Sequence, residues 1–324
     1  MHKVKIEDCS VKRVHIEKSQ LKESSALADI EERTIQIRNE LLFEFSKAFS
    51  VCFKYVSLEE SDIVGSISYY HSRSKNMVIT SVINDIVDRQ LSDLPTGGTP
   101  NVSCNRRKAF EFQDQGGVDH EGKYTIFGQI ISGLQTECPD MSCFRQNSVD
   151  GRCYKVKFKG EGSVDAGGPF RDTLVNIVDE MEDGVLPLLI KSPNNRNDDG
   201  SCRDCFILNP TATSPAHLEM YRFMGAFLGF AIISKSPIPF NLAPTFWKQL
   251  LKEQLTLADL ESIDVFSFRV LTDLRSHGAS LSDAEFEDGV CQNFATVLSN
   301  GDEVLLCEGG DERLVTKDSI EEFI

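Results

Sequence analysis

The chain has 324 residues, of which 40% are hydrophobic and 26% charged, the composition of a globular protein with a large core. Its formal net charge of -16 argues against nucleic acid and anionic membranes as partners, because phosphates are bound mainly by lysine and arginine. A basic or neutral protein partner fits better. The ten cysteines are irregularly spaced and no apolar leader opens the sequence, so we expect free thiols in the reducing cytoplasm.

The first third of the chain is predicted to be helical after a polar start. Residues 1–25 show no pattern and are expected to form a disordered arm. Residues 26–94 are expected to form a helical extension, because apolar residues recur at helical spacing over 37–53 and over 76–94. The breaker residues in "PTGGTPNVSCN" then indicate a linker at 95–105.

A strand, a glycine-rich loop and a helix follow one another near the middle of the chain. Apolar residues alternate with lysine over 154–159, which predicts a strand with one buried face. In the loop, Gly168 is expected to cap a helix that begins at Pro169. Asp165 stands where a dinucleotide fingerprint requires glycine, so we interpret the loop as a tight joint and not as a phosphate cradle. Glu161 and Asp165 are expected to occupy the free amides of the helix themselves.

Helices dominate the second half of the chain. The apolar stretch 218–233 contains Arg222 and is too short to span a membrane, so we expect a buried core helix. Gly225 and Gly229 on this helix would let another element of the fold approach closely. The helix that begins at Pro244 is expected to turn four residues inward: Phe246, Trp247, Leu250 and Leu251.

Short strands and turns are predicted among these helices. "LPLLI" and "DCFILNP" indicate two strands joined by a polar loop, and Asn300-Gly301 predicts a β-hairpin. Thr256 with Asp259 indicates a capping box, and a helix is expected from Val265 to Gly278. The acidic stretch "LSDAEFEDG" is expected to be a surface loop. The predicted fold class is therefore α+β and mainly helical.

The chain ends in "TKDSIEEFI", a helical pattern that begins with a cap at Thr316. Ile320, Phe323 and Ile324 share one face, and the pattern stops after about two turns, too few for a helix that stands alone. Because the stop directly follows apolar residues, we expect that a larger domain has been cut here.

The residues alone indicate no self-contained active site. Cys202 and Cys205 form a lone CxxC pair without a second pair of zinc ligands, so neither a metal site nor a cofactor is expected. The histidines are dispersed, and neither GxSxG nor HExxH occurs. A metal or redox protein built on the two cysteines is nevertheless the alternative from a different functional class.

Four motifs in register resemble the N-terminal lobe of HECT-type ubiquitin ligases: "VKFKGEGSVDAGGPFRD", "FILNP", "YRFMGAFLGFAI" and "LAPTFWKQLL". Within that family, "LLIKSPNNRNDDGSCRDCFILNPTATSP", "RNELLFEFSKAF" and "VDHEGKYTIFGQ" look like the large HERC branch. The resemblance covers residues 105–324 well and 30–94 more loosely. It implies a HECT N-lobe-like fold with short β-hairpins after the helical extension. The large subdomain would span 106–260, and a truncated conjugating-enzyme-binding subdomain would span 261–324.

The resemblance implies a ubiquitin-protein ligase that docks a ubiquitin-charged conjugating enzyme and acts on protein substrates. In this family a cysteine of the C-terminal lobe accepts ubiquitin as a thioester. Cys143 and Cys205 each precede a phenylalanine but lie in the wrong part of the pattern, so no catalytic residue is expected in this chain. A module that binds a conjugating enzyme without transferring ubiquitin is the alternative.

The resemblance also assigns roles to individual residues. Five residues of the helix after Asp264 and the following hairpin are candidates for enzyme docking: Phe266, Phe268, Leu271, Leu274 and Phe294. Buried core is the competing interpretation for each of them. Four residues belong to the structural loop of the family: Glu161, Asp165, Gly167 and Gly168.

Overall fold

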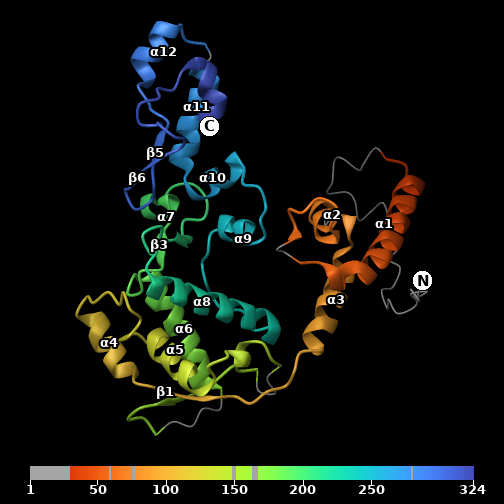
Figure 1. Cartoon of the computed structure of the whole chain (residues 1–324), viewed down its shortest axis with the longest axis vertical. Helices are drawn as coiled ribbons and strands as arrows, with labels where there is room; N and C mark the ends of the chain where they lie inside the picture. The colour runs from red at the N-terminus through yellow and green to blue at the C-terminus, as the bar shows by residue number, and fades with distance from the viewer. Residues whose placement is uncertain (1–29, 58–59, 75–76, 148–150, 163–166, 279) are drawn as a thin grey trace. The chain divides into compact units, whose positions relative to one another are not determined.

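The computed structural model describes residues 30–57, 60–74, 77–147, 151–162, 167–278 and 280–324 (Figure 1). The chain divides into two compact units, Met1–Leu94 and Pro95–Ile324. Among the helices of the described residues, none offers an apolar stretch of the length that a bilayer crossing requires.

The first unit is helical. Its elements are α1 (Glu32–Cys52), η3 (Phe53–Tyr55), α2 (Ile67–Ser74) and α3 (Thr80–Ser92). The helices predicted over 37–53 and 76–94 are α1 and α3, whereas α2 was not predicted. A buried serine joins the two longer helices, because the Ser46 hydroxyl donates to the Leu42 carbonyl (2.6 Å) and accepts from the Ile79 amide (2.9 Å).

The second unit begins with a body, which we define as residues 95–263. Its elements in chain order are β1 (Asn101–Cys104), α4 (Arg106–Asp114), α5 (Ile126–Glu137), η6 (Ser142–Phe144), β2 (Lys155–Phe158), α6 (Gly168–Glu182), β3 (Leu189–Lys191), α7 (Pro193–Asn197), β4 (Phe206–Leu208), α8 (Pro215–Ser234), α9 (Pro244–Leu250) and α10 (Leu257–Ile263). In Figure 1, α5 and α6 lie below α8. This mainly helical α+β arrangement is the predicted fold class.

Aromatic side chains from α6, α8, η6 and the start of β2 fill the core of the body. The ring of Tyr154 meets Phe170 edge-on with 5.0 Å between centroids, and Phe144 meets Phe227 in the same way at 5.1 Å. All four side chains are buried. Burial of a large apolar side chain contributes about 1.5–3 kcal/mol, so these rings dominate the stability of the body.

The strands of the body pair in two small sheets. β1 and β2 are parallel, with Asn101 opposite Lys155, and β3 and β4 are antiparallel, with Ile190 opposite Ile207. The alternation predicted for the middle strand is confirmed, because Val156 is buried while Lys157 is exposed. Part of the segment expected to be a linker, residues 101–104, is strand β1.

The glycine-rich loop is a strand-to-helix joint. Gly167, with φ 112°, is the N-cap of α6, so Gly168 is the first residue of the helix and not its cap. Glu161 does not occupy the amides of this helix as expected. Its carboxylate accepts two hydrogen bonds from the Arg106 guanidinium, at 2.7 and 2.5 Å. Asp165 lies outside the described residues.

Three local predictions were wrong. The polar loop between β3 and β4 contains α7, and the acidic stretch expected as a loop is largely helix α12 (Asp283–Val290) with a capping box of Ser282 and Glu285. Of the four residues expected to face inward at α9, Phe246 packs against the core, while three are substantially exposed: Trp247 at 40%, Leu250 at 57% and Leu251 at 52%. The capping box predicted at Thr256 and Asp259 is confirmed.

A buried carboxylate holds the first turn of α5. Glu180 of α6 accepts hydrogen bonds from the amides of Ile126 (2.6 Å) and Phe127 (2.9 Å). These amides have no partner within their own helix, and the helix dipole favours a negative charge at this end. Burial nevertheless raises the pKa of the Glu180 carboxyl from 4.5 to about 7.

Glu180→Gln is expected to change how stability depends on pH. Because the pKa of Glu180 is higher in the folded state, its stabilisation is complete below about pH 4.5 and is lost as the pH rises through about 7. Between about pH 8 and pH 5 the wild-type chain should therefore gain about 2 kcal/mol relative to the variant, in urea unfolding at each pH. A difference between the two proteins that stays constant with pH would contradict this expectation.

A C-terminal subdomain follows Asp264, which connects it to the body; we define it as residues 265–324. Its elements are α11 (Val265–Gly278), α12, β5 (Ala295–Val297), β6 (Glu303–Leu305), η7 (Lys317–Ser319) and α13 (Ile320–Phe323). β5 and β6 pair antiparallel around the predicted Asn300-Gly301 turn, where Gly301 has φ 94°. Four buried side chains form its own core: Phe286, Phe294, Val315 and Ile320.

Candidate docking groove

An open groove of about 690 Å³ runs between α11 and the β5–β6 hairpin. The residues that line it are mostly apolar, and Phe323 of α13 also reaches it. Three of its apolar side chains are strongly exposed: Phe266 at 68%, Val297 at 66% and Val270 at 49%. Apolar residues that gather in an exposed concave surface mark a site for binding another protein.

The start of α11 is well defined by its sequence. Asp264 precedes the helix and accepts hydrogen bonds from the amide (3.0 Å) and hydroxyl (2.6 Å) of Ser267. The helix ends at Gly278, where a side chain would collide with the Phe286 ring at 2.9 Å. Both ends of the helical wall of the groove are therefore fixed by local contacts.

Helical spacing separates the predicted docking residues on α11. Phe266, Leu271 and Leu274 line the groove. Phe268 does not line it, because two positions from Phe266 along an α-helix correspond to a turn of about 200°. Phe268 is half-buried on another face of α11.

Phe294 was a docking candidate with buried core as the competing interpretation, and the structure places it in the core of the C-terminal subdomain. Its side chain is 2% exposed, and its ring meets Phe323 edge-on at 5.5 Å between centroids. The Arg313 guanidinium lies 3.9 Å from the centre of the same ring and donates to Glu322 at 2.7 and 2.5 Å. Phe294 thus supports α13 without lining the groove.

Val270, Val297 and Phe323 are among the lining residues of the groove that sequence reasoning missed. Val270 follows Phe266 by four positions, so the helical period could have found it. Strand alternation could not have found Val297, because it places Val297 on the same face of β5 as Ala295, which is buried. Phe323 could be located only with knowledge of how α13 packs against α11.

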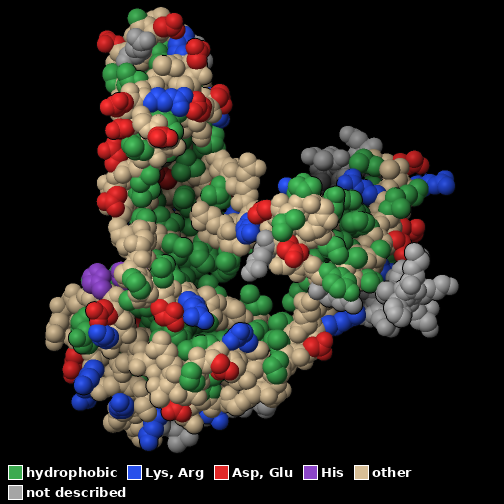
Figure 2. Space-filling model, in the orientation of Figure 1, with side chains coloured by type: hydrophobic (Ala, Val, Ile, Leu, Met, Phe, Trp, Pro, Cys, Tyr) green, Lys and Arg blue, Asp and Glu red, His purple; other side chains and the backbone are tan. Residues whose placement is uncertain are grey.

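The surface around the groove is acidic. The described side chains of α12 include the carboxylates of Asp283, Glu285 and Asp288 but no lysine or arginine, and Glu303 of β6 lines the groove itself. Figure 2 shows acidic side chains, with hydrophobic ones among them, over the α11–α12 end of the second unit. Such a rim favours a partner with basic residues around an apolar contact and steers its approach.

The buried cysteines are poor nucleophiles. Burial raises the pKa of Cys104, Cys143 and Cys205 to about 12 each, and that of Cys153 well above 9. A thiol with such a pKa remains protonated at neutral pH, whereas the thiolate is the reactive species. No group of three or more metal-ligating side chains gathers among the described residues, so Cys202 and Cys205 do not belong to a metal cluster there.

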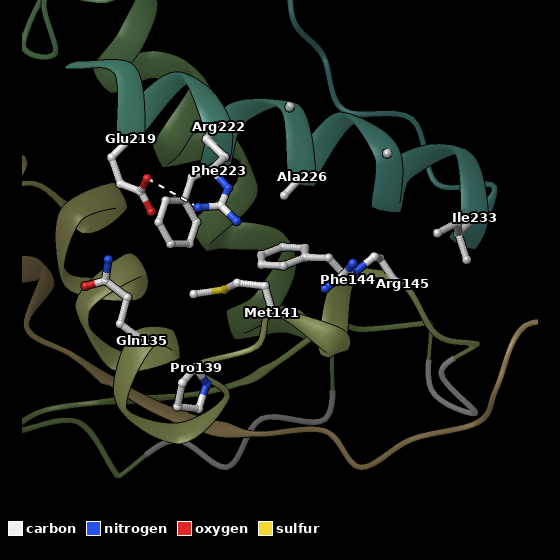
Figure 3. Close-up of a pocket in the computed structure, with 12 residues that line it drawn as sticks. Gln135, Pro139, Met141, Phe144, Arg145, Glu219, Arg222, Phe223, Ala226 and Ile233 are labelled. Carbon is white, nitrogen blue, oxygen red and sulfur yellow. Dashed lines mark ion pairs between the residues drawn. The ribbon is translucent and has the colours of Figure 1, made fainter. Parts of the chain in front are cut away.

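A second concave surface of about 500 Å³ runs along α8 (Figure 3). Met141 and Phe144 face Phe223 across it, and Arg222 pairs with Glu219 at 3.6 Å on its edge. Gly225 and Gly229 also line it, and a side chain at either position would meet no atom within 4 Å. The expected close approach of another element to these glycines is therefore wrong.

Comparison with known proteins gives a consistent result. Residues 186–324 match the family model of the HECT domain, described as a ubiquitin-transferase. The chain is 34% identical over 245 residues to "E3 ubiquitin-protein ligase HERC2" of Mus musculus, and likewise to that of Homo sapiens. It is 25% identical over 222 residues to "Probable E3 ubiquitin-protein ligase HECTD4" of Homo sapiens. The HERC2 matches cover 71% of this chain but only 5% of the relative's length.

Proposed function

Through residues 186–324 this chain belongs to the HECT-domain family, with a sequence similar to the HERC branch, and on that premise we propose that it docks a ubiquitin-charged conjugating enzyme. It would do so as the N-lobe portion of a cytoplasmic ubiquitin-protein ligase. The open apolar groove beside Phe266 carries the proposal. We assign residues 106–260 to the large subdomain of the lobe and 261–324 to the docking subdomain.

The groove suits a partner that inserts an apolar side chain from a loop. Phe266 and Val297 are exposed on α11 and β5, so both can be covered by a partner without any change in the fold. A few such anchors usually supply most of the binding energy of a protein interface. The acidic residues around the groove, Glu303 among them, would then interact with basic residues of the conjugating enzyme.

Phe266→Ala is expected to lower the affinity for a conjugating enzyme about 10-fold or more, because it removes the most exposed aromatic anchor. Fold stability should not change, since the ring is 68% exposed. Biolayer interferometry against a panel of purified ubiquitin-conjugating enzymes measures the affinity. Leu218→Ala is the matched control, because Leu218 is 59% exposed on α8 and does not line the groove.

Three results would contradict the proposal. The first is that no conjugating enzyme in the panel binds the wild-type chain. The second is that one binds the wild-type chain and Phe266→Ala equally well. Equal losses of affinity in Phe266→Ala and Leu218→Ala would also rule out the groove as the binding site, because Phe266 lines the groove and Leu218 does not.

A module that binds the conjugating enzyme without transferring ubiquitin is the second candidate function, and it would use the same groove. The protonated state of the buried thiols of Cys104, Cys143, Cys153 and Cys205 favours it, since each burial raises the pKa. Incubation with activating enzyme, conjugating enzyme and ubiquitin separates the two functions. A ubiquitin adduct on this chain that a reducing agent releases would indicate transfer, whereas binding without such an adduct would indicate the module.

A further inference from the structure

The body and the C-terminal subdomain have separate hydrophobic cores. The core of the body extends along the chain as far as Phe246, while the core of the C-terminal subdomain begins at Leu274. No described residue belongs to both cores. The direction in which α11 leaves the body therefore depends on contacts other than a shared apolar interior.

One buried side chain makes the central contacts at this junction. Asn194 of α7 is 1% exposed, and its Oδ1 accepts a hydrogen bond from the amide of Val265, the first residue of α11, at 2.8 Å. Its Nδ2 donates to the carbonyl of Glu261 in α10 (3.1 Å) and to that of Ser201 (3.0 Å). A single amide group thus joins α7, the loop before β4, the end of α10 and the start of α11.

The surrounding backbone leaves little room for Asn194 to move. Gly200 has φ 73°, and a side chain there would lie 2.8 Å from Nδ2 of Asn194 and 3.0 Å from Cβ of Val265. The loop therefore packs tightly against both the asparagine and the start of α11. All the hydrogen-bonding atoms of the Asn194 amide group are used in this one geometry, which makes the joint specific.

Among the described residues, two other polar contacts between side chains of the body and the C-terminal subdomain are seen, and both are exposed. Arg196 donates to the carbonyl of Ser299 at 2.9 Å, and Arg269 pairs with Asp199 at 3.1 Å with side chains 61% and 53% exposed. Exposed ion pairs contribute about 0–1 kcal/mol, because water screens them. They hold the direction of α11 much less firmly than the buried amide does.

We propose that the chain between α10 and α11 is a hinge and that Asn194 is a positioning residue there. Its hydrogen bonds fix the direction of α11, and of the groove beside it, relative to the body. The proposal rests on the proposed function in one respect: the groove is taken as the seat of the conjugating enzyme. The hinge then sets where the enzyme-bound ubiquitin points. No atom of Asn194 lines the groove, so the affinity of the groove for a partner does not depend on Asn194.

The test measures the distance between the two parts directly. Spin labels are attached through unnatural amino acids at Val175 in the body and Asp302 in the hairpin turn, both exposed, because the chain has ten cysteines. In Asn194→Ala the distribution of distances between the two labels should become about twofold broader than in the wild type. The reason is that the hydrogen bonds from Asn194 no longer hold α11 in one direction. Arg196→Ala is the matched control and should leave the distribution unchanged.

Two further measurements separate positioning from a general structural role. In Asn194→Ala the affinity for the conjugating enzyme should stay within about twofold of wild type, because no atom of Asn194 lines the groove. The amides of α5 and α8 should keep their protection from hydrogen exchange, because the core of the body lies elsewhere. If the alanine variant does not fold, Asn194→Asp replaces it, since its carboxylate keeps the acceptor for Val265 but places an oxygen against the carbonyls of Ser201 and Glu261.

Each remaining outcome decides the question. A lower melting temperature with an unchanged distance distribution would contradict the proposal that Asn194 positions α11. Failure of both Asn194→Ala and Asn194→Asp to fold would contradict it as well. If no conjugating enzyme binds the wild-type chain, the proposed function fails, but the label distances still determine whether Asn194 holds α11 in place.

Discussion

Gly128→Ala is expected to lower the free energy of unfolding of the body by about 3 kcal/mol. A Cβ atom at this position of α5 would lie 1.7 Å from the carbonyl oxygen of Gly122, far inside any allowed contact. The neighbour is backbone, so no flexible side chain can move aside. Urea unfolding followed by circular dichroism measures the loss.

Neither side of this contact can retreat cheaply. The loop that contains Gly122 is held by the buried carboxylate of Asp119, which accepts three backbone hydrogen bonds, from Lys123 (2.9 Å), Tyr124 (2.7 Å) and Thr125 (2.9 Å). The first turn of α5 is held by Glu180 in the same way. To relieve the collision, the backbone would have to break the hydrogen bonds to Asp119 or those to Glu180. Loss of such buried hydrogen bonds costs more free energy than loss of an exposed one.

Gly225→Ala is the matched control for Gly128→Ala. Gly225 also lies within a helix, but a Cβ atom there would meet nothing within 4 Å. It should therefore stabilise α8 by about 0.5–1 kcal/mol, as alanine does in an open helical position. Equal effects of the two substitutions would show that helix propensity, and not the approach of Gly122, governs Gly128.

Local signals in the sequence predicted much of the fold. The capping box at Thr256 and the turn at Asn300-Gly301 are formed as expected, because each depends on residues a few positions apart. α12 could have been predicted from the capping box of Ser282 and Glu285, but its acidic composition favoured a loop. β1 had no comparable signal, since its parallel pairing with β2 joins segments far apart in the chain.

The candidate site was harder to predict than the fold. The sequence identified α11 as one wall, but it could not show which apolar residues face outward. Phe266 in α11 and Phe294 directly before β5 are the same residue type, yet one is 68% exposed and the other 2%. That difference arises from the packing of α13 and Arg313 over Phe294, which no local pattern reports.

Phe294→Ala is expected to unfold the C-terminal subdomain while the body remains folded. Removal of a fully buried phenylalanine costs about 3–5 kcal/mol, which is comparable to the whole stability that a small core supplies. In the part of the subdomain that the structure describes, this core has four buried side chains, and the substitution also removes the ring that Phe323 and Arg313 contact. The body has a separate core and should keep its own cooperative transition.

Hydrogen exchange distinguishes unfolding of the C-terminal subdomain from the loss of a direct contact with the conjugating enzyme. In Phe294→Ala the amides of α12 and of the β5–β6 hairpin should lose protection, those of α5 and α8 should keep it, and binding of the conjugating enzyme should disappear. Phe266→Ala should lose binding with all protection intact, because its ring is exposed. If Phe294→Ala kept full protection and still lost binding, Phe294 would be a direct contact of the partner, and its burial here would not describe the bound state.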